Sequence, residues 1–257
     1  MSKKHVVDGN YSSEQYWNSR YESNNNSHDW YYNFDVLKPL IELTIKKNHR
    51  KKSSVYDDID ILEIGCGDRP LAIGIAKQNP KSIHAIDFSR SIITLLKRDV
   101  DNNNQSVLYQ EMDARKMTYL DSSFDFVVDK GTIDAMLCCD DRKESYKNVT
   151  SIISETIRVM KNISSFMIIS HIEVESDEFD ELMQEILLPV LTDYKESVWT
   201  IEAHVVNKSQ IKKRKQKKDN NGYGTVYTIS RSIRKLTRNS LNTPSVVNFE
   251  VLEYDES

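Results

Sequence analysis

The chain has 257 residues, 39% of them hydrophobic and 29% charged, and its 35 basic and 39 acidic side chains give a formal net charge of −4. This length suits one large domain or two small ones. The slight excess of acidic side chains argues against a protein that binds phosphate groups over most of its surface. No apolar run reaches the roughly 18 residues that a membrane-spanning helix needs, and the N-terminus lacks the apolar segment of a signal peptide. The 3 cysteines have no CxxC or Cys/His spacing, so we expect a cytoplasmic protein with neither a disulfide framework nor a metal site.

From residue 55 onward, β-rich runs alternate with amphipathic helical patterns. Strands are predicted over residues 55–65, 81–89, 106–114, 123–131 and 164–172, and helices over 70–78, 89–100, 145–160 and 179–191. This alternation predicts right-handed βαβ units and an α/β fold with a mainly parallel sheet and helices on both faces.

The end of the pattern differs, because only a polar loop separates the strand-like runs 196–206 and 222–232. Without a crossover helix, these two strands should pair as an antiparallel hairpin. We therefore divide the chain into an N-terminal aromatic segment (1–54), a core (55–235) with a basic loop (207–222), and a C-terminal segment (236–257). The C-terminal segment is either an extra strand or a loosely docked tail.

The first candidate for ligand binding is the glycine turn EIGCGDRP, residues 63–70, between a strand and a helix. Glycines let the backbone approach a ligand closely, and the helix N-terminus behind them favours anionic or polar groups. A dinucleotide fingerprint would carry a third glycine where this chain has Pro70, which weakens a dehydrogenase interpretation. Glu63, two residues before the first glycine, fits a nucleoside-plus-amino-acid ligand instead, and a turn without any ligand is the alternative.

Acidic residues stand at the ends of the next two predicted strands. Asp87 stands where a carboxylate can accept hydrogen bonds from a ribose diol, with Phe88 beside it for an adenine face, or it caps the next helix. Asp113 could accept from an adenine amine beside the backbone N–H of Ala114, or be a solvated loop acid. A fourth motif, VVDKGTIDAM, leaves the next strand. Ligands of open α/β sheets bind beyond the carboxyl ends of the strands, so the co-location of these motifs predicts one site.

The motifs EIGCG, AIDFS, MDARKM and FDFVVDKGTIDAM, with QYWNSRY and HDWYYNF nearer the N-terminus, resemble the class I S-adenosylmethionine-dependent methyltransferases. Within that class the chain most resembles the group that methylates lysines of translation elongation factor 1-alpha, over about residues 11–232 without the polar inserts. The resemblance implies a Rossmann-like seven-stranded fold, S-adenosylmethionine as cofactor, and elongation factor 1-alpha as a cytoplasmic protein substrate. It further implies a cofactor site lined by Gly65, Asp87, Phe88, Asp113, Ala114 and Lys130, under a lid that contains Trp17, Tyr21 and Trp30.

Methyl transfer to a lysine needs alignment and a neutral amine. An amine with an ordinary pKa of about 10.4 must first lose a proton, and Asp129 and Asp134 are the carboxylates nearest the expected reaction centre, so we predict both as catalytic. Aromatic faces suit the sulfonium cation of the cofactor, although the N-terminal aromatic residues could simply pack a helix on the sheet.

At Asp68-Arg69-Pro70 the chain departs from the group, which usually has Asn-Ser, so contacts at the methionine end should differ.

The run IKKRKQKK, residues 211–218, is a solvated loop, a docking segment for an acidic partner, ribosomal RNA or a tRNA-bound substrate, or a nuclear import signal. Nucleic acid is expected only through this run. The sequence lacks an Asn/Asp-Pro-Pro-aromatic motif, which disfavours nucleic-acid bases as methyl acceptors. We expect His28, His84, His171 and His204 to be structural or surface residues.

The alternatives to protein-lysine methylation are a small-molecule methyltransferase and a cofactor-binding module without transfer activity.

Overall fold

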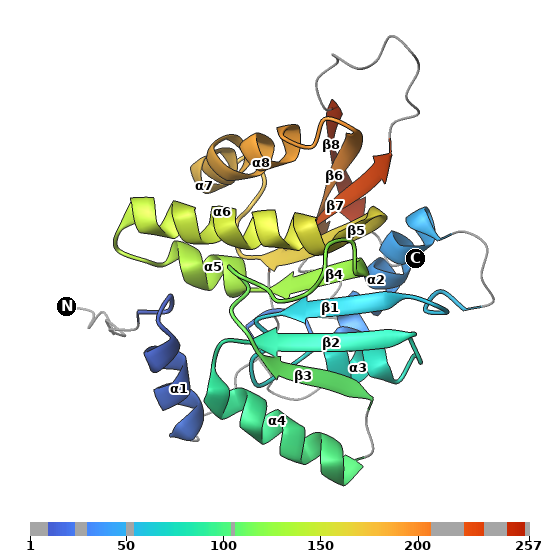
Figure 1. Ribbon diagram of the computed structural model, residues 1–257. Helices are drawn as coiled ribbons and strands as arrows, with labels where there is room; N and C mark the ends of the chain where they lie inside the picture. The colour runs from blue at the N-terminus through green and yellow to red at the C-terminus, as the bar shows by residue number, and fades with distance from the viewer. Residues whose placement is uncertain are drawn as a thin grey trace.

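One eight-stranded sheet forms the frame of the computed structural model, which describes residues 10–23, 30–49, 54–103, 106–206, 224–233 and 246–254. The strands lie in the order β3-β2-β1-β4-β5-β7-β6-β8 (Figure 1). Their bounds are β1 (Asp60–Ile64), β2 (Ser82–Asp87), β3 (Val107–Glu111), β4 (Phe124–Lys130), β5 (Met160–Ser170), β6 (Ser197–Val206), β7 (Thr225–Ile233) and β8 (Val246–Tyr254).

The strand directions confirm the predicted α/β fold. Strands β1 to β5 pair in parallel, and β7 runs antiparallel to both β5 and β6. Helices lie between β1 and β2, between β2 and β3, and between β4 and β5, whereas residues 112–123 connect β3 to β4 without a helix. Strands β6 and β7 pair antiparallel, as predicted for a hairpin. The predicted basic loop at 207–222, including the run 211–218, lies outside the described residues.

The C-terminal segment supplies an eighth strand, so the sheet is one strand larger than the seven that the resemblance implied. Strand β8 pairs in parallel with β6, from Val246 opposite Val198 to Tyr254 opposite Val206. Of the two alternatives for residues 236–257, the extra strand is therefore the one observed, over 246–254. It covers backbone groups of β6 that would otherwise form an open sheet edge.

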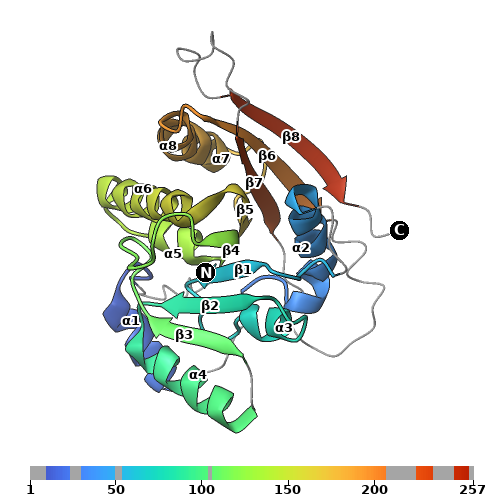
Figure 2. The ribbon, with the colours of Figure 1, turned by 45° about the vertical axis from the view of Figure 1, so that its right-hand side comes forward.

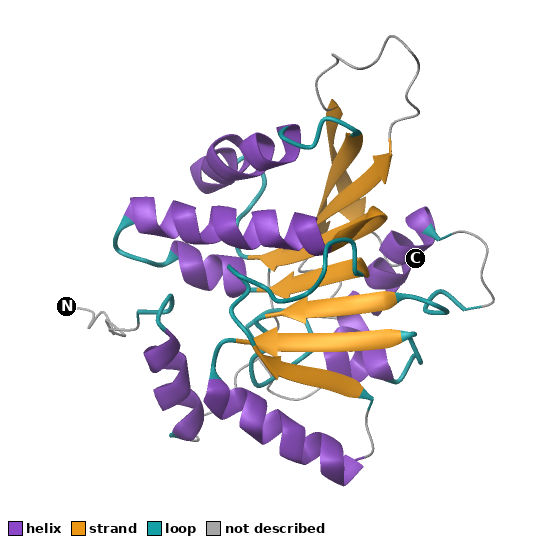
Figure 3. Ribbon diagram, viewed as in Figure 1, coloured by secondary structure: helices purple, strands orange, loops and turns teal. Residues whose placement is uncertain are grey.

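Helices cover both faces of the sheet (Figures 2 and 3). Their bounds are α1 (Glu14–Glu22), α2 (Phe34–Asn48), α3 (Ala72–Ala76), α4 (Arg90–Asn103), α5 (Thr132–Leu137), α6 (Arg142–Val159), α7 (Asp177–Glu181), the π-helical η1 (Leu182–Leu187) and α8 (Leu188–Thr192). One buried apolar cluster joins the sheet to α5, α6 and the α7-η1-α8 segment, and a second joins it to α2, α3 and α4. Among the described helices, none has both the length and the apolar character that crossing a membrane requires.

The N-terminal segment 1–54 divides into two parts with different surroundings. Helix α2 buries Leu37, Leu40 and Ile41 in the apolar cluster on its face of the sheet, so it is a core helix. Helix α1 has no buried residue and lies against α4, where Asn18 accepts a hydrogen bond of 2.7 Å from the Ser89 hydroxyl. Only α1 and the residues around it therefore have the exposed position that a lid needs.

The predicted helix over 179–191 is observed as three consecutive helical pieces, α7, η1 and α8. The π-helical piece ends two residues before Pro189, which has no backbone N–H to donate to the preceding turn. The proline interrupts the regular hydrogen-bond pattern of the helix. The single apolar periodicity in the sequence therefore corresponds to a helix that changes from α to π and back to α.

Candidate functional site

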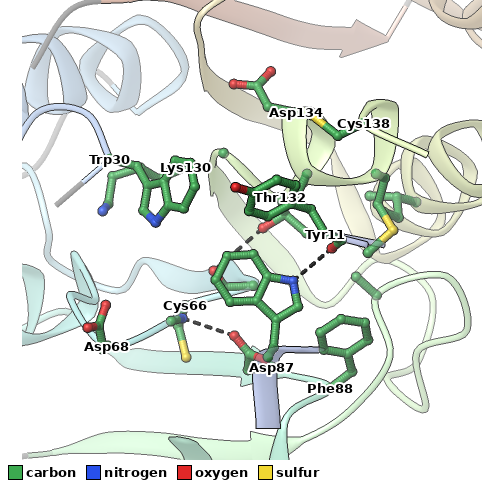
Figure 4. Close-up of a pocket in the computed structure, with 18 of the residues that line it drawn as sticks. Tyr11, Trp30, Cys66, Asp68, Asp87, Phe88, Lys130, Thr132, Asp134 and Cys138 are labelled. Atoms are coloured by element: carbon green, nitrogen blue, oxygen red, sulfur yellow. Dashed lines mark hydrogen bonds between the residues drawn. The ribbon is translucent and has the colours of Figure 1, made fainter. Parts of the chain in front are cut away.

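A cavity of about 420 Å³ opens at the carboxyl ends of the parallel strands (Figure 4). Its lining follows the strand order: Asp113 comes after β3, Asp87 ends β2, Gly65 follows β1, Lys130 ends β4 and His171 follows β5. This is the place where open α/β sheets bind their ligands. The described residues hold no cluster of three or more His, Cys, Asp or Glu that could bind a metal ion.

Most of the predicted site residues meet in this cavity, and two do not. The lining includes Trp17, Trp30, Gly65, Asp87, Phe88, Asp113, Ala114, Lys130 and Asp134. Tyr21 and Asp129 are not part of it. The ring of Tyr21 instead stacks on Trp17 with the centroids 5.7 Å apart, so it supports a lining residue from behind.

Asp87 ties the glycine turn to the end of β2. Its carboxylate accepts a hydrogen bond from the backbone N–H of Gly67 at 3.0 Å (Figure 4) and another from the backbone N–H of Ser89 at 2.9 Å. The side chain is almost fully buried, and this burial raises the pKa of Asp87 to about 6. The residue thus supports the turn and also presents its carboxylate to the cavity.

The glycine turn and the DKGT motif are in direct contact. Gly65 has a φ of +57°, and a Cβ at this position would lie only 1.9 Å from the Thr132 hydroxyl oxygen. That hydroxyl donates a hydrogen bond of 3.2 Å to the carbonyl of Ile64. Glu63 has a structural role, since its buried carboxylate accepts the backbone N–H groups of Leu71 and Ala72 at 2.9 and 2.8 Å.

At the β3 end of the cavity, Asp113 is held by a bidentate ion pair. Its two carboxylate oxygens accept hydrogen bonds from the guanidinium of Arg115 at 2.8 to 3.0 Å, and Arg115 also donates to Asn148 at 3.0 Å. Burial works to raise the pKa of Asp113, but the bonds and charge of Arg115 outweigh it, and the pKa lies below its ordinary value. An ionised acceptor is therefore fixed beside Ala114 and Met112, which also line the cavity.

At the β4–β5 end, Asp134 is the centre of a buried hydrogen-bond cluster. Its carboxylate accepts from the Tyr31 hydroxyl, from the Ser170 hydroxyl at 2.6 Å, and from the backbone N–H of His171 at 3.0 Å. Nδ1 of the His171 ring lies 3.1 Å from the same carboxylate. Burial works to raise the pKa of Asp134, but these donors outweigh it and hold the pKa below the ordinary range. Figure 4 shows Asp134 at the end of the cavity opposite Asp87 and Phe88.

Asp129, the other acid predicted as catalytic, has different surroundings. It is fully buried and accepts the backbone N–H groups of Thr132, at 3.0 Å, and Ile133, at 3.3 Å, at the beginning of α5. Burial raises its pKa to about 7. In this position the carboxylate satisfies free N–H groups of a helix terminus rather than facing the cavity.

Aromatic side chains from the N-terminal segment form one wall of the cavity. Tyr11, Trp17, Trp30 and Tyr31 all line it. The indole N–H of Trp17 donates to the Tyr11 carbonyl at 2.7 Å (Figure 4), and the guanidinium of Arg20 lies 5.6 Å from the ring centroids of both Trp17 and Trp30. The N-terminal segment therefore contributes to the site itself, in addition to packing.

Sequence reasoning missed three residues of the Asp134 end and its surroundings. Thr132 stands inside the DKGT motif and Tyr31 directly follows Trp30, so both were near residues that the motifs singled out. His171 was expected to be a structural or surface residue, and its side chain is indeed 43% exposed, but it also lines the cavity. Its position just after a parallel strand was the available signal, since such positions border ligand sites.

Comparisons with known proteins agree with this geometry. Residues 61–161 match the family model described as a methyltransferase domain. The Bos taurus protein named EEF1A lysine methyltransferase 4 is 26% identical over 164 residues, which are 61% of this chain and 60% of the relative. The Homo sapiens protein named eEF1A lysine and N-terminal methyltransferase is 24% identical over 201 residues, 78% of this chain and 26% of the relative.

The chain thus spans less than two thirds of the length of these curated relatives. Among solved structures, Haemonchus contortus phosphoethanolamine N-methyltransferase 1, in complex with phosphoethanolamine and S-adenosylhomocysteine, has the same fold. It gives a TM-score of 0.54 at 13% identity, over 89% of this chain and 50% of that chain. The chain therefore contains a class I S-adenosylmethionine-dependent methyltransferase domain, distantly related, at about 25% identity, to eEF1A lysine methyltransferases.

Proposed function

We propose that this chain transfers the methyl group of S-adenosylmethionine to the ε-amine of a protein lysine, with translation elongation factor 1-alpha as the substrate. The observation that carries the proposal is a single cavity with acidic groups at both ends, Asp87 and Asp113 at one and Asp134 at the other. The names of the curated relatives support the choice of substrate, and such a substrate would place the reaction in the cytoplasm.

The residues of the β1–β3 end fit the cofactor. We propose that Asp87 accepts hydrogen bonds from the ribose hydroxyls, because its carboxylate lines the cavity and each oxygen retains a free lone pair beside its N–H partner. Phe88 and Met112 offer apolar surface for the adenine, and Asp113 with the backbone N–H of Ala114 offers an acceptor and a donor for the ring edge. When bound, the cofactor supplies a methyl group that is already activated by the positive sulfur.

The other end of the cavity suits a cationic amine. Asp134 gives this end a fixed negative charge, and the rings of Trp30 and Tyr31 provide faces that attract cations. We therefore assign the acidic group on the acceptor side to Asp134. For Asp129 we propose a supporting role, because its carboxylate is taken up by the first N–H groups of α5.

The proposal keeps the aromatic lid but limits it to α1 and Trp30. We propose that α1 with Trp17, backed by Tyr21, closes over the bound cofactor together with Trp30. The basic run 211–218 lies outside the described residues, so docking of an acidic partner to it stays a prediction from sequence.

The test is transfer of tritiated methyl groups from S-adenosylmethionine into a lysate of cells with under-methylated elongation factor 1-alpha. Three proteins are compared: the wild type, Asp87→Asn, and Asp35→Asn, a matched change at an exposed position in the first turn of α2. We expect one labelled band at the size of the elongation factor with the wild type and the control, and none with Asp87→Asn. Mapping by mass spectrometry must then give methyl-lysine.

Each other outcome has a clear meaning. Label that appears only in small molecules would replace this proposal by the metabolite enzyme. Cofactor binding measured by calorimetry without any transfer to the elongation factor would favour the binding-module interpretation.

A further inference from the structure

His171 occupies an unusual position among the residues of the cavity. It follows the last residue of β5, its side chain is 43% exposed, and its ring lines the cavity. Nδ1 lies 3.1 Å from the carboxylate of Asp134. Among the described residues, no protein group forms a hydrogen bond with the other ring nitrogen, Nε2.

The surroundings of Asp134 determine which ring nitrogen of His171 carries the proton. The carboxylate receives donors from the Tyr31 hydroxyl, the Ser170 hydroxyl and the His171 backbone, which is the arrangement of an ionised acid. An ionised carboxylate can only accept, so Nδ1 must carry the hydrogen that points to it. The neutral ring then has its lone pair on Nε2, on the side away from Asp134.

We infer that His171 is a catalytic residue, the base that removes a proton from the acceptor ammonium, and that Asp134 is the residue that positions it. The inference rests on the proposed lysine methylation. One N–H bond of the lysine ammonium breaks and its electron pair stays on the nitrogen, while the proton bonds to Nε2. The freed lone pair forms the new N–C bond to the methyl group, while the C–S bond breaks and its electron pair stays on the sulfur of the departing S-adenosylhomocysteine. The imidazolium, stabilised by Asp134, passes its proton to water after turnover, so one proton is released for each methyl added.

The charged and titratable groups around His171 support this role. Asp134 on α5 and Glu178 on α7 are the acids whose negative charges raise the pKa of His171. The Tyr31 hydroxyl donates a hydrogen bond to Asp134. On the side of β7, the Tyr227 hydroxyl donates to the Ile172 carbonyl at 2.7 Å. The hydrogen bond with Asp134 raises the pKa of His171 above its ordinary value of 6.5, against a smaller opposing effect of burial. A base with a pKa near the working pH is an efficient proton acceptor.

The first measurement concerns the ring itself and needs no turnover. Two-dimensional ¹H–¹⁵N spectra of the imidazole rings are recorded on the full chain with S-adenosylhomocysteine, as a function of pH, for the wild type and Asp134→Asn. The His171 signals are assigned by their absence in His171→Asn. We expect a neutral ring with the proton on Nδ1 and a pKa above 6.5, and a lower pKa in Asp134→Asn. A proton on Nε2, or a pKa unaffected by Asp134→Asn, would overturn the inference.

The second measurement separates proton transfer from a structural role. His171→Asn keeps a side-chain N–H for Asp134 but has no basic nitrogen, whereas His171→Ala has neither. We expect both variants to lose roughly 10²- to 10⁴-fold in kcat near neutral pH, with unchanged affinity for S-adenosylhomocysteine. The residual rate should rise about tenfold per pH unit, because only lysine deprotonated by solvent then reacts.

The two proposals fail in different ways. A rate of His171→Asn within about threefold of the wild type, with a parallel pH profile, would sink the role of His171 and leave lysine methylation intact. A wild type that binds the cofactor but methylates no amine would end the proposed function, and this inference with it.

Discussion

The ring of Tyr31 lies directly over Gly131, so closely that a Cβ added to the glycine would be 2.8 Å from Cε2 of the tyrosine. Gly131 has a φ of +84° and immediately precedes α5, which carries Asp134. The same tyrosine donates its hydroxyl to Asp134, 103 residues away in the sequence. One glycine therefore makes room for the ring whose hydroxyl orients Asp134 at the β4–β5 end of the cavity.

This contact predicts a specific cost for Gly131→Ala. The substitution imposes a left-handed backbone on a residue with a side chain and pushes the new methyl group into Tyr31, so we expect a loss of about 1–3 kcal/mol in the free energy of unfolding. Chemical denaturation measures it. In a Tyr31→Ala background the same change should cost less, since the clash is gone and only backbone strain remains. Equal costs in both backgrounds would contradict the packing argument.

Tyr31→Phe tests the hydroxyl without disturbing the ring. It removes one donor to Asp134 and leaves the donors from Ser170 and His171 in place. We expect the pKa of Asp134 to rise and the free energy of unfolding to fall by about 1–3 kcal/mol, as for other hydrogen bonds to charged groups. Carbonyl ¹³C NMR of the carboxylate gives the pKa. An unchanged pKa of Asp134 would show that the hydroxyl does not support the ionised state.

The raised pKa of Asp87 predicts that the affinity for the cofactor depends on pH. Its pKa of about 6 means that the carboxyl is protonated below that pH, whereas the ionised form is the stronger acceptor for both ribose hydroxyls. Binding must then lower the pKa, so affinity for S-adenosylhomocysteine should fall by up to about tenfold per pH unit below pH 6 and be constant above it. Calorimetry in two buffers of different ionisation enthalpy detects the released proton. Asp87→Asn should bind more weakly and lose this pH dependence, and a variant that keeps it would show that another group titrates.

Asp60, at the beginning of β1 and far from the cavity, should contribute to the stability of the fold. Its carboxylate accepts from the ammonium groups of Lys161 and Lys81, both at 2.8 Å. Burial works to raise the pKa of Asp60, but these bonds lower it from 3.8 to about 2, a difference equivalent to about 2 kcal/mol. Because the folded-state pKa is the lower one, this stabilisation is present above about pH 4 and is lost as the pH falls through 2.

Asp60→Asn should therefore destabilise the protein at neutral pH, with a difference from the wild type that disappears near pH 2. Urea denaturation at several pH values measures it. The control is Asp121→Asn, whose carboxylate pairs with Arg158 at 2.8 Å but is 77% exposed, so it should cost less than about 1 kcal/mol. Equal effects of the two changes would show that burial does not decide the strength of these pairs.

Local features of the chain were sufficient to predict the architecture and the β1–β3 end of the site. Alternating apolar runs and helical periodicities specify βαβ units, because a parallel sheet buries both faces and needs long crossover connections, which contain helices everywhere from β1 to β5 except between β3 and β4. Gly65, Asp87 and Asp113 all stand at the ends of predicted strands. The topology of a parallel sheet brings such positions to one edge, so their meeting in one cavity follows from their places in the sequence.

The β4–β5 end of the cavity was decided by the tertiary structure. Asp129 and Asp134 are equivalent acids by sequence, five residues apart, yet Asp129 caps α5 while Asp134 meets Tyr31, Ser170 and His171. No local pattern separates them, because the difference depends on side chains that come from two distant parts of the chain, at Tyr31 and at residues 170–171. The eighth strand has the same explanation: residues 246–254 become a strand only because β6 offers a free edge at the matching register.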